Sequence, residues 1–516
     1  GAVRGSVPEN DGFSTELLRM NRFCMGIKRG NKYVCGGEVH DPNVVDNAVD
    51  LLAEAIRRLL RWRVWTGWWI DWWRGEWIRV GGSVDAVLSN KYGSDLVNPV
   101  LKLVDEFTMY IKELRSYWFR NDVGYEIRDL TNDIRSGRAT IIIWSDGSGF
   151  SVYGNHVTLS AHRISDSAIV HLGLKGLKGE VINAPDIFRP INTSLSEIIL
   201  GLRSGFAATD EYVSDGKPAM TTTQPWQALL WSLLYPGRVR IRVDGINVNK
   251  GGITMSWDLI AHNHHSLKDL LPEYTAKLSN PALYALILTA ILGDGSTYFE
   301  DPTTDGYYCR KPTIKITVSN NKSKLLEPIL NRLGIKWVGN PDEHGDAIRI
   351  TISDDNATSL ARAMIDALPP VLHDILDALD IRKWLVIKRI AEAEPGPSDS
   401  PIMIAGYGFA IHVRKDTVEL RRRVRNWVKV SEVINALRTR YDEELATNIR
   451  VEKDGDRLNI VIPARMIERY SDIKAQTIKA LCRKYAEARD EAKKQGIIKA
   501  LRRLTPTEGA AAARPW

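Results

Sequence analysis

An apolar helix near the middle of the chain constrains the fold more than any other segment of the sequence. Asn280 and Pro281 supply a helix N-cap and a first helical residue, and the run LYALILTAILG follows without a charged side chain. Gly293 ends the helix, and Asp294 comes directly after it. The run is interrupted by Thr289 and is too short to span a bilayer, so it predicts a helix of a globular domain.

The segments after this helix alternate between strand and helix patterns. The alternation of apolar and polar residues and the Gly and Pro breaks predict strands at 297–300, 312–319, 335–338 and 347–353 and helices at 322–333 and 356–368. With the apolar helix in front, the order is αββαββα. The same order is predicted again downstream, with helices at 372–393, 430–445 and 473–494 and strands at 402–413, 418–427, 448–453 and 458–462. Two such units in succession indicate an internal duplication.

The segment ALYALILTAILGDGS, residues 282–296, resembles the signature helix of the LAGLIDADG homing endonucleases. The αββαββα order after it is that of the family's core unit, and the resemblance covers 281–370 by motif and 371–495 by order alone. It implies an α+β fold in which two units form a pseudo-dimer with a β-saddle, and hence a monomer with an internal pseudo-two-fold axis. Ala285, Thr289 and Gly293, spaced by four residues, are the small side chains that allow two such helices to pack closely.

The resemblance also implies catalytic residues. In the family, an acid just past each signature helix holds Mg²⁺, which activates water and stabilises the leaving 3′ oxygen of a phosphodiester. Asp294 takes this position in the first unit, and the segment IAEAEPG places Glu394 there in the second. Asp294 and Glu394 are therefore the expected metal ligands. Lys322, one residue after the place of a family lysine, is the third catalytic candidate.

Alternate positions on the predicted strands carry polar and basic side chains. In the family, the concave face of the saddle lies in the DNA major groove and needs such residues. The expected DNA-contacting residues are Lys315, Thr317, Arg349, Arg414, Arg421 and Arg423. Double-stranded DNA is the expected partner, with RNA as the alternative.

The charge distribution also favours a polyanionic partner. The 516-residue chain has 44% apolar and 26% charged residues, which is ordinary for a globular protein and excludes collagen-like and mainly disordered classes. Its net charge is +7, but residues 402–516 alone hold 25 basic and 15 acidic residues. The positive excess therefore lies in the C-terminal segment, as is typical of nucleic-acid binding.

The first 280 residues lie outside the resemblance. Residues 1–138 are predicted to be mostly helical, and Trp62, Trp65, Trp69 and Trp72 or Trp73 recur at a spacing that predicts one helical stripe. We interpret the stripe as a Trp-rich core or oligomer contact, with base stacking or membrane-surface binding as alternatives. Residues 139–280 predict a mixed α+β domain without a catalytic motif. The two LAGLIDADG-like units are expected at 281–395 and 396–516.

The four cysteines form no CxxC pair. They predict free thiols in a cytoplasmic protein, with a Cys24–Cys35 disulfide as the alternative for a hyperthermophilic source. No segment of the sequence is predicted to cross a membrane.

The sequence thus predicts a DNA-binding protein with Mg²⁺-dependent phosphodiester hydrolysis. The overall layout resembles archaeal repetitive-element proteins that carry such a domain, which would place it in a mobile element. Because one acidic motif is clear and the other is not, a non-catalytic regulator or an RNA maturase is the first alternative. A structural or membrane-surface protein that uses the Trp stripe is the second.

Overall fold

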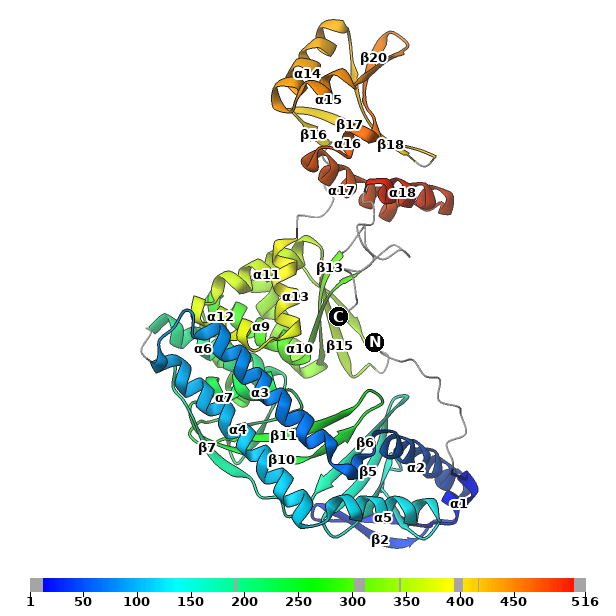
Figure 1. Ribbon diagram of the computed structural model, residues 1–516, viewed down its shortest axis with the longest axis vertical. Helices are drawn as coiled ribbons and strands as arrows, with labels where there is room; N and C mark the ends of the chain where they lie inside the picture. Colours follow the sequence, from blue (N-terminus) through cyan, green and yellow to red (C-terminus); the bar gives the residue numbers. More distant parts are fainter. Residues whose placement is uncertain are drawn as a thin grey trace. The chain divides into compact units, whose positions relative to one another are not determined.

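The computed structural model describes residues 13–189, 193–300, 311–342, 345–393, 402–415 and 417–504 (Figure 1). The chain divides into two compact units. The first comprises Gly1–Asp294, Asn320–Ile329 and Ala363–Leu385, and the second comprises the remaining residues. No helix in the described part of the chain has the length and apolar character that crossing a membrane requires.

Eleven strands among the described residues form one sheet in the first unit. They are β1 (Arg22–Arg29), β2 (Lys32–Glu38), β3 (Thr140–Ile143), β4 (Gly149–Tyr153), β5 (Val157–Ile164), β6 (Ser167–Leu174), β7 (Glu180–Ala184), β8 (Glu211–Ser214), β9 (Lys217–Thr222), β10 (Gly237–Val248) and β11 (Ile253–Ala261). The order is β2-β1-β3-β4-β5-β6-β10-β11-β9-β8, and β7 pairs with β10. β1 and β3 are parallel, while the other pairs are antiparallel.

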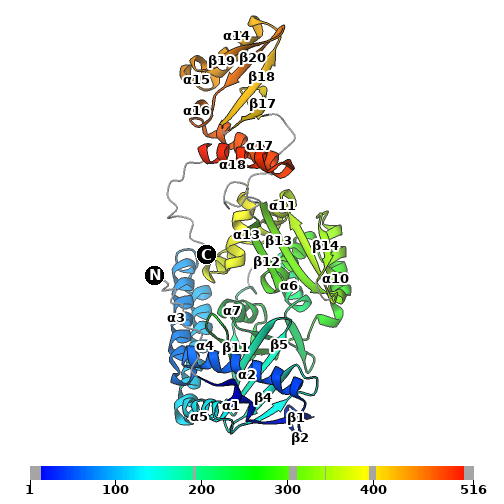
Figure 2. The same cartoon turned by 90° about the vertical axis from the view of Figure 1, so that its right-hand side faces the viewer.

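The N-terminal helices confirm the prediction of a mostly helical first segment, although the β1–β2 hairpin was not predicted. They are α1 (Thr15–Arg19), α2 (Pro42–Trp62), the 3₁₀ turn η1 (Val64–Thr66), α3 (Trp68–Leu88), α4 (Ser94–Arg120) and α5 (Val123–Arg135). α3 and α4 lie side by side (Figure 2).

The tryptophans do not form the predicted stripe on one helix. Trp62 is the last residue of α2, Trp65 lies in the 3₁₀ turn, and Trp69 belongs to α3. The helix is interrupted because Arg63 and Gly67 both adopt left-handed backbone conformations. The prediction of a single stripe is therefore wrong.

The burial of these tryptophans confirms the Trp-rich core for part of the set. Trp69 and Trp77 are fully buried and Trp73 is 8% exposed. Trp68 and Trp72, in contrast, are 41% and 51% exposed. The helix thus presents its aromatic residues both to the core and to the surface.

Two successive segments have the same αββαββα order. The first consists of α6 (Thr193–Ala208), β8, β9, α7 (Pro225–Leu234), β10, β11, and, after the turn η2 (Lys268–Leu270), α8 (Leu271–Lys277). The second consists of α9 (Asn280–Asp294), β12 (Gly295–Glu300), β13 (Lys311–Ser319), α10 (Asn320–Arg332), β14 (Val338–Pro341), β15 (Ala347–Ser353) and α11 (Asp355–Ala367). Their strand orders are β8-β9-β11-β10 and β12-β13-β15-β14, so in each the fourth strand pairs with the second. The second segment agrees with its predicted elements except that the strand predicted at 335–338 lies at Val338–Pro341, and the duplication upstream of it was not predicted.

The C-terminal segment has the same strand order with one strand added. Its elements are β16 (Ile402–Ile404), β17 (Tyr407–Arg414), β18 (Thr417–Val424), α14 (Trp427–Arg440), α15 (Glu443–Thr447), β19 (Arg450–Asp454), β20 (Arg457–Ile462), α16 (Ala464–Ile467), α17 (Ser471–Glu487) and α18 (Glu491–Leu504). The sheet order is β16-β17-β18-β20-β19. The helix predicted at 372–393 is instead α12 (Pro370–Ala378) and α13 (Arg382–Glu392), because Asp380 is left-handed.

A disulfide joins Cys24 of β1 to Cys35 of β2, and Cys482 is also disulfide-bonded. The prediction of free thiols is therefore wrong at these positions. The alternative that paired Cys24 with Cys35 is confirmed.

Candidate active site

The helices α6 and α9 are in close contact, and two glycines of α6 face α9 where a larger residue would not fit. A Cβ atom on Gly201 would lie 2.2 Å from the carbonyl oxygen of Ala282, and one on Gly205 would lie 1.9 Å from Oγ1 of Thr289. The Thr289 hydroxyl donates a 2.8 Å hydrogen bond to the carbonyl of Leu202 on the facing helix. Small residues on both helices therefore fix their separation.

An aspartate lies at the end of each packed helix. Asp210 follows α6, Asp294 is the last residue of α9, and their side chains share a hydrogen bond. The two aspartates are 84 positions apart, and the same spacing relates Gly201 to Ala285, Gly205 to Thr289 and Thr209 to Gly293. The close packing of the helices thus brings together two equivalent carboxylates.

The electrostatics of this pair follow from its burial and proximity. Burial, the hydrogen bond with Asp294 and the charge of Asp294 raise the pKa of Asp210 to about 7. The hydrogen bond from Gln227 and the charge of Lys383 act in the opposite direction. Asp210 is half-buried whereas Asp294 is exposed. Below about pH 7 Asp210 therefore holds a proton, which it shares with Asp294 through their hydrogen bond.

Polar side chains of α7, β9 and α10 lie around the end of α6. Gln227 of α7 donates a 2.5 Å hydrogen bond from Nε2 to Oδ2 of Asp210. Thr222 fixes the orientation of Gln227, because its hydroxyl donates to Oε1 at 2.6 Å. Lys322 of α10 donates from Nζ to the carbonyl of Thr209 at 2.6 Å. The ammonium of Lys322, a predicted catalytic candidate, therefore contacts the backbone of the residue that precedes Asp210.

The aspartate pair has the donor chemistry of a Mg²⁺ site. Mg²⁺ prefers oxygen ligands and is often held by one or two carboxylates together with waters. A divalent cation would replace the shared proton, and the exposure of Asp294 leaves coordination positions open to water. Within the described ranges, no group of three or more His, Cys, Asp and Glu side chains is placed to hold a metal. The fit is therefore to a two-carboxylate site.

Of the two acids predicted as metal ligands, the structure describes Asp294 but not Glu394. Asp294 lies where the resemblance implied, at the end of α9. Glu394 lies outside the described residues, so its predicted role as second metal ligand stays a prediction. The acid in contact with Asp294 is Asp210, which the sequence interpretation missed. The signal that could have identified Asp210 is the 84-residue spacing that relates Gly201, Gly205 and Asp210 to Ala285, Thr289 and Asp294.

The strands β13 and β15 carry the predicted alternation. The side chains of Ile314, Ile316 and Val318 are buried, whereas Thr317 is exposed and Lys315 is half-buried. Arg349 pairs in register with Thr317 and is also exposed. Lys315, Thr317 and Arg349 therefore share one polar face of this sheet.

The predicted basic residues of the C-terminal sheet are paired with carboxylates. Arg414 and Arg421 lie 3.9 and 3.0 Å from Glu419, and Arg423 lies 3.3 Å from Asp454. The side chain of Arg421 is only 13% exposed. These ion pairs neutralise much of the charge that the sequence suggested for this face.

A basic strand face in the first unit was not singled out from the sequence. Three arginines alternate with buried apolar residues along β10: Arg238, Arg240 and Arg242. Burial and the nearby charges of Lys217, Arg238 and Arg240 lower the pKa of His262, the residue that follows the neighbouring strand β11. This face of β10 is therefore basic, with Arg238 exposed, Arg240 half-buried, and Arg242 half-buried and paired with Asp244 at 2.6 Å.

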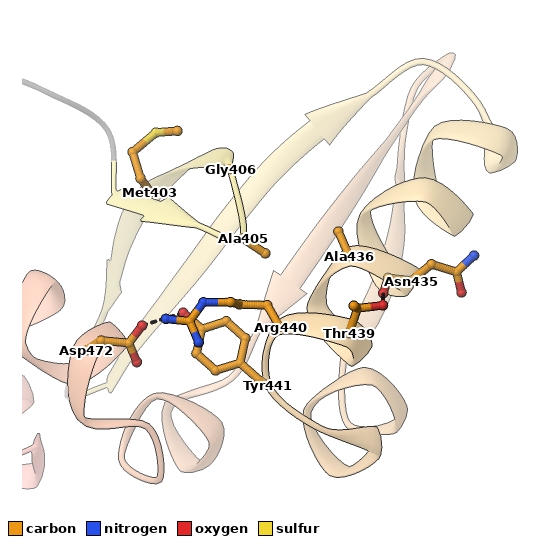
Figure 3. Close-up of a pocket in the computed structure, with 9 residues that line it drawn as sticks. All are labelled: Met403, Ala405, Gly406, Asn435, Ala436, Thr439, Arg440, Tyr441 and Asp472. Atoms are coloured by element: carbon orange, nitrogen blue, oxygen red, sulfur yellow. Dashed lines mark hydrogen bonds between the residues drawn. The ribbon is translucent and has the colours of Figure 1, made fainter.

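The C-terminal segment contains a pocket whose lining differs from that of the acid pair (Figure 3). It is lined by Met403, Ala405, Gly406, Asn435, Ala436, Thr439, Arg440, Tyr441 and Asp472. The hydroxyl of Tyr441 donates to the carboxylate of Asp472 at 2.5 Å. This lining lacks the paired acids found at the ends of α6 and α9.

A buried carboxyl beside the site predicts a pH-dependent stability. Burial raises the pKa of Glu211, the residue after Asp210, to about 8, although Tyr235 donates hydrogen bonds to it at 2.6 and 2.9 Å. The folded chain keeps this proton up to about pH 8, whereas the unfolded chain loses it near pH 4.5. Stability is therefore expected to fall between these values, by about 5 kcal/mol in total.

Glu211→Gln is expected to remove this loss of stability at high pH. Well above pH 8 the variant should be more stable than the parent by about 4–5 kcal/mol, and near pH 4.5 the two should agree within about 1 kcal/mol. Denaturant unfolding of the full chain at pH 5, 7 and 9 measures the difference. Gln at the exposed Glu16 is the control, and equal pH profiles for Glu211→Gln and the parent would refute a buried protonated carboxyl.

No protein-family model and no curated protein matches the chain. Among solved structures, the homing endonuclease I-WcaI bound to its DNA recognition sequence is similar at 13% identity and a TM-score of 0.24, over 36% of this chain and 88% of that one. The I-SmaMI LAGLIDADG homing endonuclease bound to cleaved DNA matches at 12% identity and a TM-score of 0.14, over 45% and 97% of the two chains. The LAGLIDADG homing endonuclease I-GzeII in complex with its DNA target matches at 11% identity and a TM-score of 0.13, over 41% of this chain and 94% of that one. Similarity at this level defines neither the family nor the activity of this chain.

Proposed function

We propose that this chain binds double-stranded DNA and hydrolyses its phosphodiester bonds with Mg²⁺. The observation that carries the proposal is the hydrogen-bonded pair of Asp210 and Asp294 at the ends of two closely packed helices. The motif around Asp294 resembles the signature of LAGLIDADG endonucleases, which place paired acids in this way.

The two halves of the proposed catalytic domain are residues 193–277 and 280–367. Their common αββαββα order, their common strand order and the 84-residue spacing of their helix residues support a pseudo-dimer within one chain. The second half is therefore paired with the segment before it in this proposal, rather than with residues 396–516.

Each residue around the acid pair has a separate role. Mg²⁺, held by Asp210 and Asp294, would supply a Lewis acid and an activated water. Gln227 holds the Asp210 carboxylate in one orientation, and Thr222 holds Gln227. Lys322 places a positive charge at the end of α6, where a phosphate approaches the acids.

Polar strand faces are the proposed contacts to DNA phosphates and bases. They comprise Lys315, Thr317 and Arg349 in the second half and Arg238, Arg240 and Arg242 in the first, of which Thr317, Arg349 and Arg238 are exposed and the others half-buried. Their charge and alternation suit a groove of double-stranded DNA. The paired Arg414, Arg421 and Arg423 are proposed as secondary contacts, because binding must compete with their carboxylate partners.

The proposal is tested by nicking of a randomised plasmid library. The full chain with Mg²⁺ is expected to nick DNA, and EDTA should stop the reaction. Asp294→Asn should lower the rate at least about 100-fold, because the variant loses a charged ligand for the metal. DNA binding measured at several salt concentrations should remain, with its salt dependence unchanged.

Salt-dependent binding without cleavage by the parent chain would refute the catalytic proposal and favour a non-catalytic regulator. Cleavage at the parent rate by Asp294→Asn would show that another site is responsible. Absence of DNA binding would reject the function as a whole.

A further inference from the structure

A lysine from outside both αββαββα segments reaches the acid pair. Lys383 belongs to α13, and its Nζ donates to the carbonyls of Leu292 and Gly293, at 2.9 Å each. A third carbonyl, that of Ile291, lies 3.4 Å away. Its ammonium therefore sits at the C-terminal end of α9, one residue before Asp294.

This position concentrates negative charge. The last carbonyls of a helix lack intrahelical donors and carry the negative end of the helix dipole. The charges of Asp210 and Asp294 both act on Lys383 and favour its charged form, although burial lowers its pKa overall. Lys383 thus contributes a positive charge to the pair from a half-buried position.

A lysine also donates a hydrogen bond to a carbonyl at the C-terminal end of α6. Lys322 donates to the carbonyl of Thr209, and Thr209 is equivalent to Gly293 by the 84-residue spacing. Each carbonyl that precedes a site aspartate therefore accepts a hydrogen bond from a lysine. The two lysines, however, come from positions that are not equivalent.

The asymmetry originates at position 227. Gln227 is the third residue of α7 and Lys322 is the third residue of α10, so the two occupy corresponding places. Symmetry would direct residue 227 to the carbonyl of Gly293, as Lys322 is directed to that of Thr209. Gln227 instead donates to Asp210, and Lys383 donates to Gly293.

We propose that Lys383 is a positioning residue of the acid pair and takes the place that the internal symmetry assigns to position 227. It holds the end of α9, and with it Asp294, and supplies the second ammonium beside the two carboxylates. The helix α13 is accordingly part of the site. This inference rests on the proposed function.

The test compares Lys383→Met with Lys383→Arg and with the double variant Lys383→Met, Gln227→Lys. Lys383→Met should lower Mg²⁺-dependent cleavage about 10- to 100-fold, because a positioning contact and a charge are lost. Arginine should restore part of the rate. Lysine at position 227 should also restore part of it, because it returns the ammonium to the place that symmetry predicts. Lys112→Met, at an exposed position of α4, is the control and should cleave like the parent.

A readout without DNA separates positioning from a structural role. Mn²⁺ binding to the full chain, followed by electron paramagnetic resonance, should be lost in Asp294→Asn. In Lys383→Met the dissociation constant should be equal to that of the parent or up to about tenfold lower, since a competing positive charge is removed. A higher dissociation constant with no recovery in either the arginine or the double variant would indicate structural collapse and overturn the inference.

The outcomes also distinguish this inference from the function on which it rests. If neither cleavage nor Mn²⁺ binding depends on Asp294, the proposed function fails. If both depend on Asp294 while Lys383→Met cleaves like the parent, the proposed function stands and the role of Lys383 is refuted.

Discussion

Asp210→Asn is expected to remove Mg²⁺-dependent DNA cleavage as completely as Asp294→Asn. The two carboxylates are in hydrogen-bonding contact at equivalent helix ends, so each supplies one charged ligand to a shared cation. Loss of that ligand removes several kcal/mol of charge stabilisation, which corresponds to about a 1000-fold lower rate. Single-turnover cleavage of plasmid DNA at saturating Mg²⁺ measures the effect.

The amide in this variant keeps the shape of the site and can still accept the hydrogen bond of Gln227. Unfolding curves and DNA affinity should therefore match those of the parent. Glu394→Gln is the informative comparison, because the sequence pattern assigned the second acid to Glu394. Full activity of Asp210→Asn together with inactivity of Glu394→Gln would show that the pattern was right and that the Asp210 contact is not catalytic.

Gly205→Ala is expected to cause the largest loss of stability of any single methyl addition between α6 and α9. The added Cβ would lie 1.9 Å from Oγ1 of Thr289 and 2.2 Å from the carbonyl oxygen of Leu286. Backbone cannot give way as a flexible side chain can, so the two helices must separate. The expected cost is about 3 kcal/mol or more, measured by denaturant unfolding of the full chain.

The control for this prediction is Gly75→Ala in α3. A Cβ there meets no atom within 4 Å, so alanine should stabilise the helix by about 0.5–1 kcal/mol through its higher helix propensity. Equal stability of Gly205→Ala and the parent would contradict the close packing of α6 and α9. Cleavage by Gly205→Ala should fall with its stability, because the separation of the helices also separates the two aspartates.

The elements around α9 could be predicted because their signals are local. Asn280 and Pro281 define the start of the helix, and the apolar–polar alternation of Ile314 to Val318 defines a strand with one buried face. The signals around α6 are weaker, because Arg203 and Ser204 interrupt its apolar run. For that reason an equivalent helix, with an equivalent aspartate, was not recognised.

The electrostatic predictions depended on which residues meet in space. A run of arginines on β18 suggested a basic surface, but Glu419 and Glu452 lie within 3.4 Å of Arg421. Glu452 belongs to β19, which is separated from β18 by β20 in the sheet, so the sequence gives no indication of this pairing. The alternating arginines of β10, of which Arg238 is exposed, were not predicted as a basic face because their strand lies in a region without a motif.

The sequence alone determined the α9 helix, the strands that follow it and the position of Asp294, because caps, periodicity and turn residues act within a few positions of one another. Only the tertiary structure decided the partner of that aspartate. Asp210 is 84 residues away and reaches Asp294 because Gly201 and Gly205 let α6 approach α9. Lys383 was likewise beyond prediction, because its role follows from where α13 meets the end of α9 and not from any residue beside it in the chain.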